Sequence, residues 1–326
     1  MDLERVASDL IRALRGRRSQ TAMSRRLGYR SNVVYRWESG RAWPTASAAM
    51  RAARRLGVDL EAGLRRFYRG EPAWVGRADV ASAEGVALLL NDLRGSLPIG
   101  ELAQRAGRSR FAVSRWLKGD AEPRLPELLL MVEATSLRLL DFLSALVDPA
   151  KLPSTAAEWE QLQAARNAAY DMPWSHAVLR ALELEEYQAL RRHQPGWIAR
   201  RLGIPAAEEE RCLALLSRTQ QIRLRRGKWV LDQSRLVDTR ADPERSLAVR
   251  SWWTRVALER IQAGHGEAFS FNLFSVSEPD LQRIKEAYRA FFQQMRAIIA
   301  ASEPNQRVVL FSTLLVPIEP LANAER

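Results

Sequence analysis

The feature that most constrains this chain is an internal repeat at an offset of 79 residues. Residues 19–44 and residues 98–123 align without a gap, and Trp37 falls on Trp116. Glycines, prolines and core-type apolar positions coincide along the same alignment. Self-similarity at a fixed period predicts a repeated structural unit. Whatever fold residues 19–44 adopt should therefore occur twice in the chain.

Each copy has the pattern of two short helices joined by a glycine turn. In the first copy, Ser19 is a suitable helix N-cap and Gly28 is placed to end that helix. A second helix is expected over residues 31–39, with Val34 and Trp37 on its buried face. Helix, turn and helix form the plan of a helix-turn-helix motif, whose second helix enters the major groove of DNA.

Basic residues are concentrated around the first copy. The chain has a formal net charge of +12, and residues 1–78 hold 17 arginines against 7 acidic residues. Residues 79–150 hold 8 basic and 10 acidic residues, so the second copy lies in a slightly negative segment. A basic module is the electrostatic signature of a polyanion binder. A solvated arginine-rich surface with no ligand is the alternative.

Length and composition favour an intracellular globular protein. A chain of 326 residues is long enough for two or three domains. Its single cysteine, Cys212, excludes an intramolecular disulfide and suits a reducing compartment. The first ten residues lack the apolar core of a signal peptide, and no run of about 18 apolar residues occurs. We therefore expect a cytoplasmic protein without a membrane span.

The periodicity predicts a mainly α protein in four parts. Two tandem five-helix bundles are expected over residues 1–70 and 80–147. A winged helix-turn-helix is expected over residues 156–240, where three helical segments precede two alternating strands around an Arg-Gly turn. The remaining part, residues 241–326, should contain a long helix and a β-α-β region for dimerisation or sensing.

The helices and strands of the last two parts can be placed from their patterns. In the winged part, helices are expected over Trp174–Tyr187, Trp197–Leu202 and Ala206–Thr219. In the last part, helices are expected over Pro243–Ala263 and Pro279–Ala301, and strands over Ala268–Val276 and Val308–Pro317. The two strand predictions depend on alternation of apolar and polar residues.

Two family resemblances accompany these patterns. Residues 19–44 resemble the Xre/Cro-type helix-turn-helix regulators, with Leu-Gly before the turn and Arg-Trp-Glu-Ser-Gly ending the second helix. Residues 83–145 are similar to a degenerate second copy, in which Leu117 replaces the glutamate. Residues 173–320, with the motifs WSHAVLRAL and WIARRLGI, resemble a bacterial family of unknown function that usually follows a helix-turn-helix. The resemblances imply a bacterial transcription regulator.

The second helix of the first copy carries side chains suited to reading bases. Asparagine can pair bidentately with adenine and arginine with guanine in the major groove, which assigns these roles to Asn32 and Arg36. An ion pair with Glu38 is the alternative for Arg36. Other polar residues would contact the DNA backbone and position this helix. The candidate DNA contacts of the first copy are Gln20, Arg30, Ser31, Asn32, Tyr35, Arg36 and Arg41.

The second copy and the wing supply further candidates. The second copy either binds DNA more weakly or serves as a protein-packing surface, and its candidate contacts are Arg108, Ser109, Arg110 and Ser114. The wing candidates are Arg223, Arg225, Arg226 and Lys228. The helix before the wing opens with Glu208, Glu209 and Glu210, whose charges would repel phosphates. We therefore expect the winged part to serve packing or dimerisation.

Patterns typical of an active site are missing from the sequence. The three histidines, His176, His193 and His265, are far apart and lack metal-ligand spacing, so we expect no metal, no cofactor and no enzymatic activity. The predicted function is sequence-specific regulation of transcription on double-stranded DNA. The C-terminal region would supply homodimerisation or signal input from an unknown effector or partner protein. The alternative is a scaffold protein that uses helix-turn-helix folds to bind partner proteins.

Overall fold

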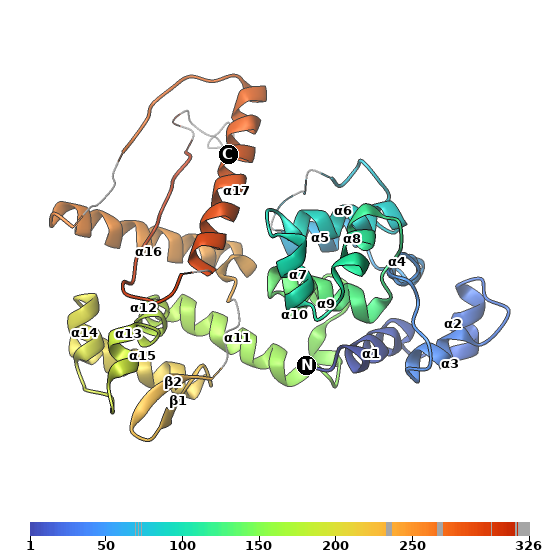
Figure 1. Cartoon of the computed structure of the whole chain (residues 1–326), viewed down its shortest axis with the longest axis horizontal. Coiled ribbons are helices and arrows are strands. Elements are labelled where there is room, and N and C mark those ends of the chain that lie inside the picture. Colours follow the sequence, from blue (N-terminus) through green and yellow to red (C-terminus); the bar gives the residue numbers. More distant parts are fainter. Residues whose placement is uncertain are drawn as a thin grey trace, which may run out of the picture. The chain divides into compact units, whose positions relative to one another are not determined.

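The computed structural model describes residues 1–68, 70, 72, 74–232, 237–265, 270–300, 302–316 and 318. The chain is mainly helical, as predicted, and the sheet found among these residues is a two-stranded hairpin (Figure 1). Contacts divide the chain into two compact units. One holds Met1–Ala164, and the other holds most of the residues from Ala165 to Ser277.

The first unit begins with five helices whose ends follow the sequence signals. Ser19 accepts a hydrogen bond from the N–H of Ala22 at 3.1 Å and so caps α2, as the sequence predicted. Thr45 caps α4 by accepting the N–H of Ala48 at 3.3 Å. The helices are α1 (Leu3–Arg15), α2 (Gln20–Arg26), α3 (Val33–Glu38), α4 (Ala46–Arg55) and α5 (Leu60–Tyr68) (Figure 1).

Five more helices follow in the same unit. They are α6 (Ala83–Arg94), α7 (Ile99–Arg105), α8 (Arg110–Lys118), α9 (Leu125–Ser136) and α10 (Leu139–Ser144). The first residues of α7, α9 and α10 each lie 79 residues after the first residues of α2, α4 and α5. The period of the sequence is therefore also the period of the helices.

The segments 1–70 and 80–147, which the sequence treated as separate domains, share one hydrophobic core. Phe67 of α5 packs edge-on against Phe142 of α10, with ring centroids 5.7 Å apart. Gly63 lies so close to the second segment that a Cβ on it would stand 2.4 Å from the carbonyl oxygen of Ala145. A single bundle of about 70 residues buries a small share of its surface, and packing on a neighbour enlarges the common core.

The second unit contains the predicted hairpin. Strands β1 (Ile222–Arg225) and β2 (Lys228–Leu231) pair antiparallel, with Ile222 opposite Leu231. Arg226 and Gly227 form the turn with φ values of +52° and +76°, the conformation that joins twisted strands in a two-residue hairpin. The preceding helices are α11 (Ala156–Asp171), α12 (Trp174–Leu182), α13 (Glu185–Ala189), α14 (Trp197–Leu202) and α15 (Ala206–Arg218).

The single helix predicted over Trp174–Tyr187 is broken in the structure. It ends as α12 at Leu182 and resumes as α13 at Glu185, because Leu184 takes an extended conformation with ψ of 136°. The side chain of Leu184 is 1% exposed and packs in the core with Val178 and Tyr187. Burial of this leucine therefore accompanies the break, which local periodicity did not indicate.

The C-terminal β-α-β prediction is wrong in its strands. Helices α16 (Pro243–Gln262) and α17 (Glu278–Ala300) form close to their predicted positions, but residues 270–277 and 302–316 contain no strand. Ala268, Phe269 and Pro317 of the predicted strands lie outside the described residues. An alternating segment becomes a strand only when a neighbour completes its hydrogen bonds. Residues near Val308 instead pack on the second unit, where the carbonyl of Asn305 accepts the N–H of Glu185 at 2.8 Å.

Acid should destabilise the second unit through His176 of α12. Burial, with a smaller contribution from Arg180, lowers the pKa of His176 to about 4. The unfolded chain binds a proton near the ordinary pKa of about 6.5, so the free energy of unfolding should fall by up to about 3 kcal/mol between about pH 7 and pH 4. Urea unfolding at both pH values should show a smaller loss for His176→Gln. The exposed His265 offers the control, because His265→Gln should keep the full loss.

Candidate nucleic-acid interface

Helix α3 is attached to the first unit by one face and leaves the other in solvent. Val34 and Trp37 are buried, and Tyr29 in the preceding turn packs edge-on against Trp37 with ring centroids 5.6 Å apart. Tyr35 and Arg36 are exposed on the remaining face. The helix is shorter than the predicted 31–39, since Val33 is its first residue and Glu38 its last. Local burial therefore presents the side chains that the sequence proposed for base contacts.

Asn32 has a structural task that the sequence did not predict. Its Oδ1 accepts the N–H of Tyr35 at 3.2 Å and the hydroxyl of Ser24 at 3.2 Å, which makes it the N-cap of α3. Bidentate pairing with adenine requires both the carbonyl oxygen and the amide nitrogen of the side chain. Because Oδ1 is already used, Asn32 positions α3, and the bidentate role assigned to it does not fit this conformation.

Gln20 and Glu38 form an internal polar cluster with Arg15. The Nε of Arg15 donates to Glu38 Oε1 at 2.5 Å, and Gln20 Nε2 donates to Glu38 Oε2 at 2.7 Å. The Glu38 side chain is 5% exposed. The partner of Glu38 is therefore Arg15, 23 residues away in sequence, and the ion pair considered between Glu38 and Arg36 is not found among the described residues. Gln20 tethers α2 to α3 and has its amide nitrogen engaged.

Replacing Arg15 by alanine should lower the free energy of unfolding of the first unit by about 3 kcal/mol, because a buried carboxylate would lose its cation. At the positions equivalent to Gln20 and Glu38, the second copy carries the apolar residues Ile99 and Leu117. Adding Gln20→Ile and Glu38→Leu to Arg15→Ala should therefore recover most of the loss. Urea unfolding followed by circular dichroism measures both. Equal instability of the two variants would exclude the buried charge as the cause.

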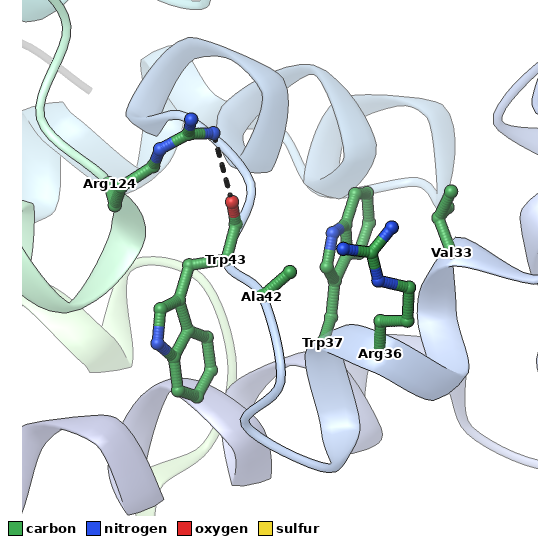
Figure 2. Close-up of a pocket in the computed structure, with 6 residues that line it drawn as sticks. All are labelled: Val33, Arg36, Trp37, Ala42, Trp43 and Arg124. Atoms are coloured by element: carbon green, nitrogen blue, oxygen red, sulfur yellow. Dashed lines mark hydrogen bonds between the residues drawn. The ribbon is translucent and has the colours of Figure 1, made fainter.

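Arg36 lies at a cationic pocket beside α3. A surface pocket of about 410 Å³ is lined by Val33, Arg36, Trp37, Ala42, Trp43 and Arg124 (Figure 2). Arg124 comes from the second copy and donates to the carbonyl of Trp43 at 3.1 Å. Arg41 lies over the ring of Tyr35 at 5.3 Å, and Arg30 and Ser31 are exposed. Most of the predicted contacts of the first copy therefore gather around α3, together with Arg124, which the sequence analysis missed.

The candidate residues of the second copy lie at the start of α8. Ser109 caps this helix by accepting the N–H of Ala112 at 3.2 Å, and Arg108 and Arg110 are exposed beside it. Ser114 is half-buried. Phe111 is 72% exposed, which is unusual for a phenylalanine in a helix that also packs on a core. The second copy therefore also presents arginine and an aromatic ring to solvent.

Two of the four wing cations are engaged within the protein. Arg223 forms an ion pair with Asp232 at 3.0 Å, and the Nζ of Lys228 donates to the carbonyl of Gln188 at 2.5 Å. Arg225 and Arg226 are exposed at the end of the hairpin. The wing therefore offers two arginines to an anionic ligand, fewer than the sequence suggested.

The acidic cluster at the start of α15 is also only partly on the surface. Glu209 is 1% exposed, accepts the N–H of Ala199 at 2.6 Å and lies 3.5 Å from His193. Glu208 pairs with Arg211, whereas Glu210 is exposed. Glu209 thus anchors α14 to α15, which reduces the repulsion of phosphate that the three glutamates were expected to cause.

The titratable groups of the second unit form no metal-binding group in the described part of the chain. Cys212 is buried, and burial raises the pKa of its thiol to about 12. Burial also lowers the pKa of His193, although the carboxylate of Glu209 opposes this effect. Among the helices that the structure describes, none is long and apolar enough to cross a bilayer.

Comparison with known families agrees with the N-terminal geometry and classifies the remainder. A helix-turn-helix family profile matches residues 11–62, which include α2 and α3. The profile of a domain of unknown function, DUF4423, matches residues 153–318, about half of the chain. The chain belongs to the DUF4423 family. No protein of curated function and no solved structure matches it.

The two matches confirm an Xre-like helix-turn-helix followed by a C-terminal DUF4423 region. The helix-turn-helix supports a DNA-binding regulator in general terms. The DUF4423 region brings no known ligand with it, because the function of that family is undefined. The degenerate second copy stays a prediction from the sequence.

Proposed function

We propose that this protein is a sequence-specific DNA-binding regulator of transcription, with α3 as its recognition helix in the major groove. The observation that carries the proposal is the exposed face of α3 within a helix-turn-helix, with Arg36 at its end. Among the described residues, no hydrogen bond or ion pair engages the guanidinium of Arg36, so it is available to guanine O6 and N7. The protein acts without enzymatic chemistry in this proposal.

Charge supports phosphate binding around this helix. Residues 1–78 hold 17 arginines against 7 acidic residues, and Arg30 and Arg41 are exposed on either side of α3. Arginines at these places can hold the DNA backbone and set the orientation of α3 without reading sequence. Tyr35 and Ser31 would complete the contact surface of the first copy.

We assign the winged arrangement of the second unit to packing rather than to DNA. Its hairpin retains only Arg225 and Arg226 as exposed candidates, and Glu210 is exposed on the adjacent α15. The balance of exposed charge beside this hairpin is therefore much less favourable to phosphate than the balance around α3.

The C-terminal region is proposed to bind a second copy of the chain, or to receive a signal from an effector. Large apolar side chains there are exposed, including Phe271 at 89%, Leu273 at 76% and Leu314 at 69%. Exposed apolar segments of this kind mark interaction surfaces. Light scattering at increasing concentration should report a dimer for the native chain and a monomer for Leu273→Asp with Leu314→Asp. A native chain that stays monomeric would contradict this assignment.

Selection of bound fragments from random DNA at two salt concentrations tests the function. A defined site should emerge, and Arg36→Ala should weaken binding to it roughly 10- to 100-fold, as expected for loss of a bidentate contact with guanine. Arg218→Ala at the exposed end of α15 is the matched control and should bind normally. The proposal fails if the full chain shifts no DNA at about 100 mM salt, and capture of a partner protein under those conditions would favour the scaffold alternative.

A further inference from the structure

The two copies of the repeat meet through equivalent residues. Ala46 donates its N–H to the carbonyl of Pro123 at 2.8 Å, and Leu125 donates its N–H to the carbonyl of Pro44 at 3.0 Å. Between these bonds, Thr45 and Arg124 form an antiparallel bridge. Each residue pairs with positions of the other copy, and Thr45 falls on Arg124 in the 79-residue alignment.

This pairing has the signature of two-fold symmetry. Exchanging the copies turns the bond from Ala46 to Pro123 into the bond from Leu125 to Pro44, so the interface maps onto itself. Reciprocal contacts between equivalent residues occur at a two-fold axis, whereas head-to-tail packing joins different surfaces.

The helix contacts obey the same rule. Helix α1 packs on α9 of the other copy, and its equivalent α6 packs on α4. Helix α5 contacts its own equivalent α10, and α4 contacts its own equivalent α9. The axis near Thr45 and Arg124 therefore relates the packing of both copies and is no accident of one loop.

We infer that one chain is an intramolecular counterpart of a helix-turn-helix dimer, and that it binds an inverted pair of unequal DNA half-sites. The inference rests on the proposed function and deepens it. In a two-fold assembly the two recognition helices face DNA in opposite orientations, and half-sites lie about one helical turn, about 10 bp, apart. Here α3 and α8 take these two places within one polypeptide.

The half-sites must differ because the two helices present different chemistry. The arginine at the end of the face is shared, since Arg36 aligns with Arg115. At the start of the face, Ser31 and Asn32 align with Arg110 and Phe111. The exposed ring of Phe111 suits the methyl group of thymine, and Arg110 suits guanine. A homodimer of identical helices would read two equal half-sites, whereas this pair would not.

Connection in one chain also explains how the less basic copy contributes. Residues 79–150 carry 10 acidic against 8 basic residues, so this copy alone would bind DNA weakly. Once α3 is bound, the attached second copy experiences an effective DNA concentration in the millimolar range. The first copy therefore supplies most of the attraction, and the second extends the sequence that is read.

The test uses the full chain on DNA sites selected as above. The selected site should contain two different half-sites in inverted orientation, with one chain per duplex at saturation. Arg36→Ala should alter the preference in one half-site, and Phe111→Ala in the other, with a loss of about fourfold for one thymine methyl. Replacing that thymine by uracil should cost the native chain the same factor and cost Phe111→Ala nothing further.

Geometry supplies the second arm. Inserting about 5 bp between the half-sites places them on opposite faces of DNA, and reversing one half-site makes a direct repeat. Either change should weaken binding by at least about 100-fold, down to the affinity for the first half-site alone. A single half-site, two equal half-sites or a tolerated insertion would overturn the inference and leave the proposed function intact. Loss of all DNA binding would instead remove the proposed function.

Discussion

Affinity for DNA is expected to fall about a thousandfold when salt rises from about 50 mM to about 200 mM. If about six phosphates are neutralised per chain, log K should fall with log salt at a slope near −5. The exposed arginines of the first copy supply this electrostatic term, since residues 1–78 hold 17 arginines against 7 acidic residues. Fluorescence anisotropy with a labelled duplex at several salt concentrations measures the slope.

Substitutions can show which arginines are responsible. Arg30→Gln with Arg41→Gln should reduce the magnitude of the slope by about 2, because each removes one phosphate contact. Arg225→Gln with Arg226→Gln at the hairpin should leave the slope unchanged, because the winged arrangement is assigned to packing. A slope near zero for the native chain, or an equal effect of both pairs, would be incompatible with the interface proposed around α3.

Phe142→Ala is expected to reduce the free energy of unfolding of the first unit by about 3–5 kcal/mol. Phe142 is 0% exposed and packs on Phe67 of the other copy, so truncation leaves a cavity where the two copies meet. Because the core is continuous across both copies, they should unfold in a single transition in the native chain. Circular dichroism and tryptophan fluorescence in urea should give coincident curves.

A phenylalanine on the surface provides the matched control. Phe111 is 72% exposed, and Phe111→Ala should change stability by no more than about 0.5 kcal/mol. Two separate transitions in the native chain would mean that the copies fold independently. That result would also weaken the two-fold arrangement, which requires the copies to be held rigidly together.

Local signals predicted the helices and turns well where neighbours in sequence decide them. Ser19 caps α2, and the hairpin turns at Arg226 and Gly227, because caps and tight turns depend on groups a few residues apart. The C-terminal strands failed for the opposite reason. Alternation in residues 270–277 is compatible with a strand, but a strand needs a partner, and none joins it in the described chain.

The candidate site divides along the same line. The sequence indicated which helix would present polar side chains, and Arg36, Tyr35 and Arg30 are exposed there. It did not indicate that Asn32 would use its Oδ1 as a helix cap. Nor did spacing reveal that Arg15 would neutralise Glu38, because 23 residues separate the two in sequence.

By itself, the sequence determined the repeated unit, its 79-residue period and the charge difference between the two copies. These properties follow from residue types and spacing, which act through local conformation and through long-range electrostatics. Only the tertiary structure decided how the copies face each other. Repeats along a chain can stack by translation or pair about an axis, and the choice depends on which surfaces bury each other. Here the reciprocal bonds of Ala46 and Leu125 selected the two-fold arrangement.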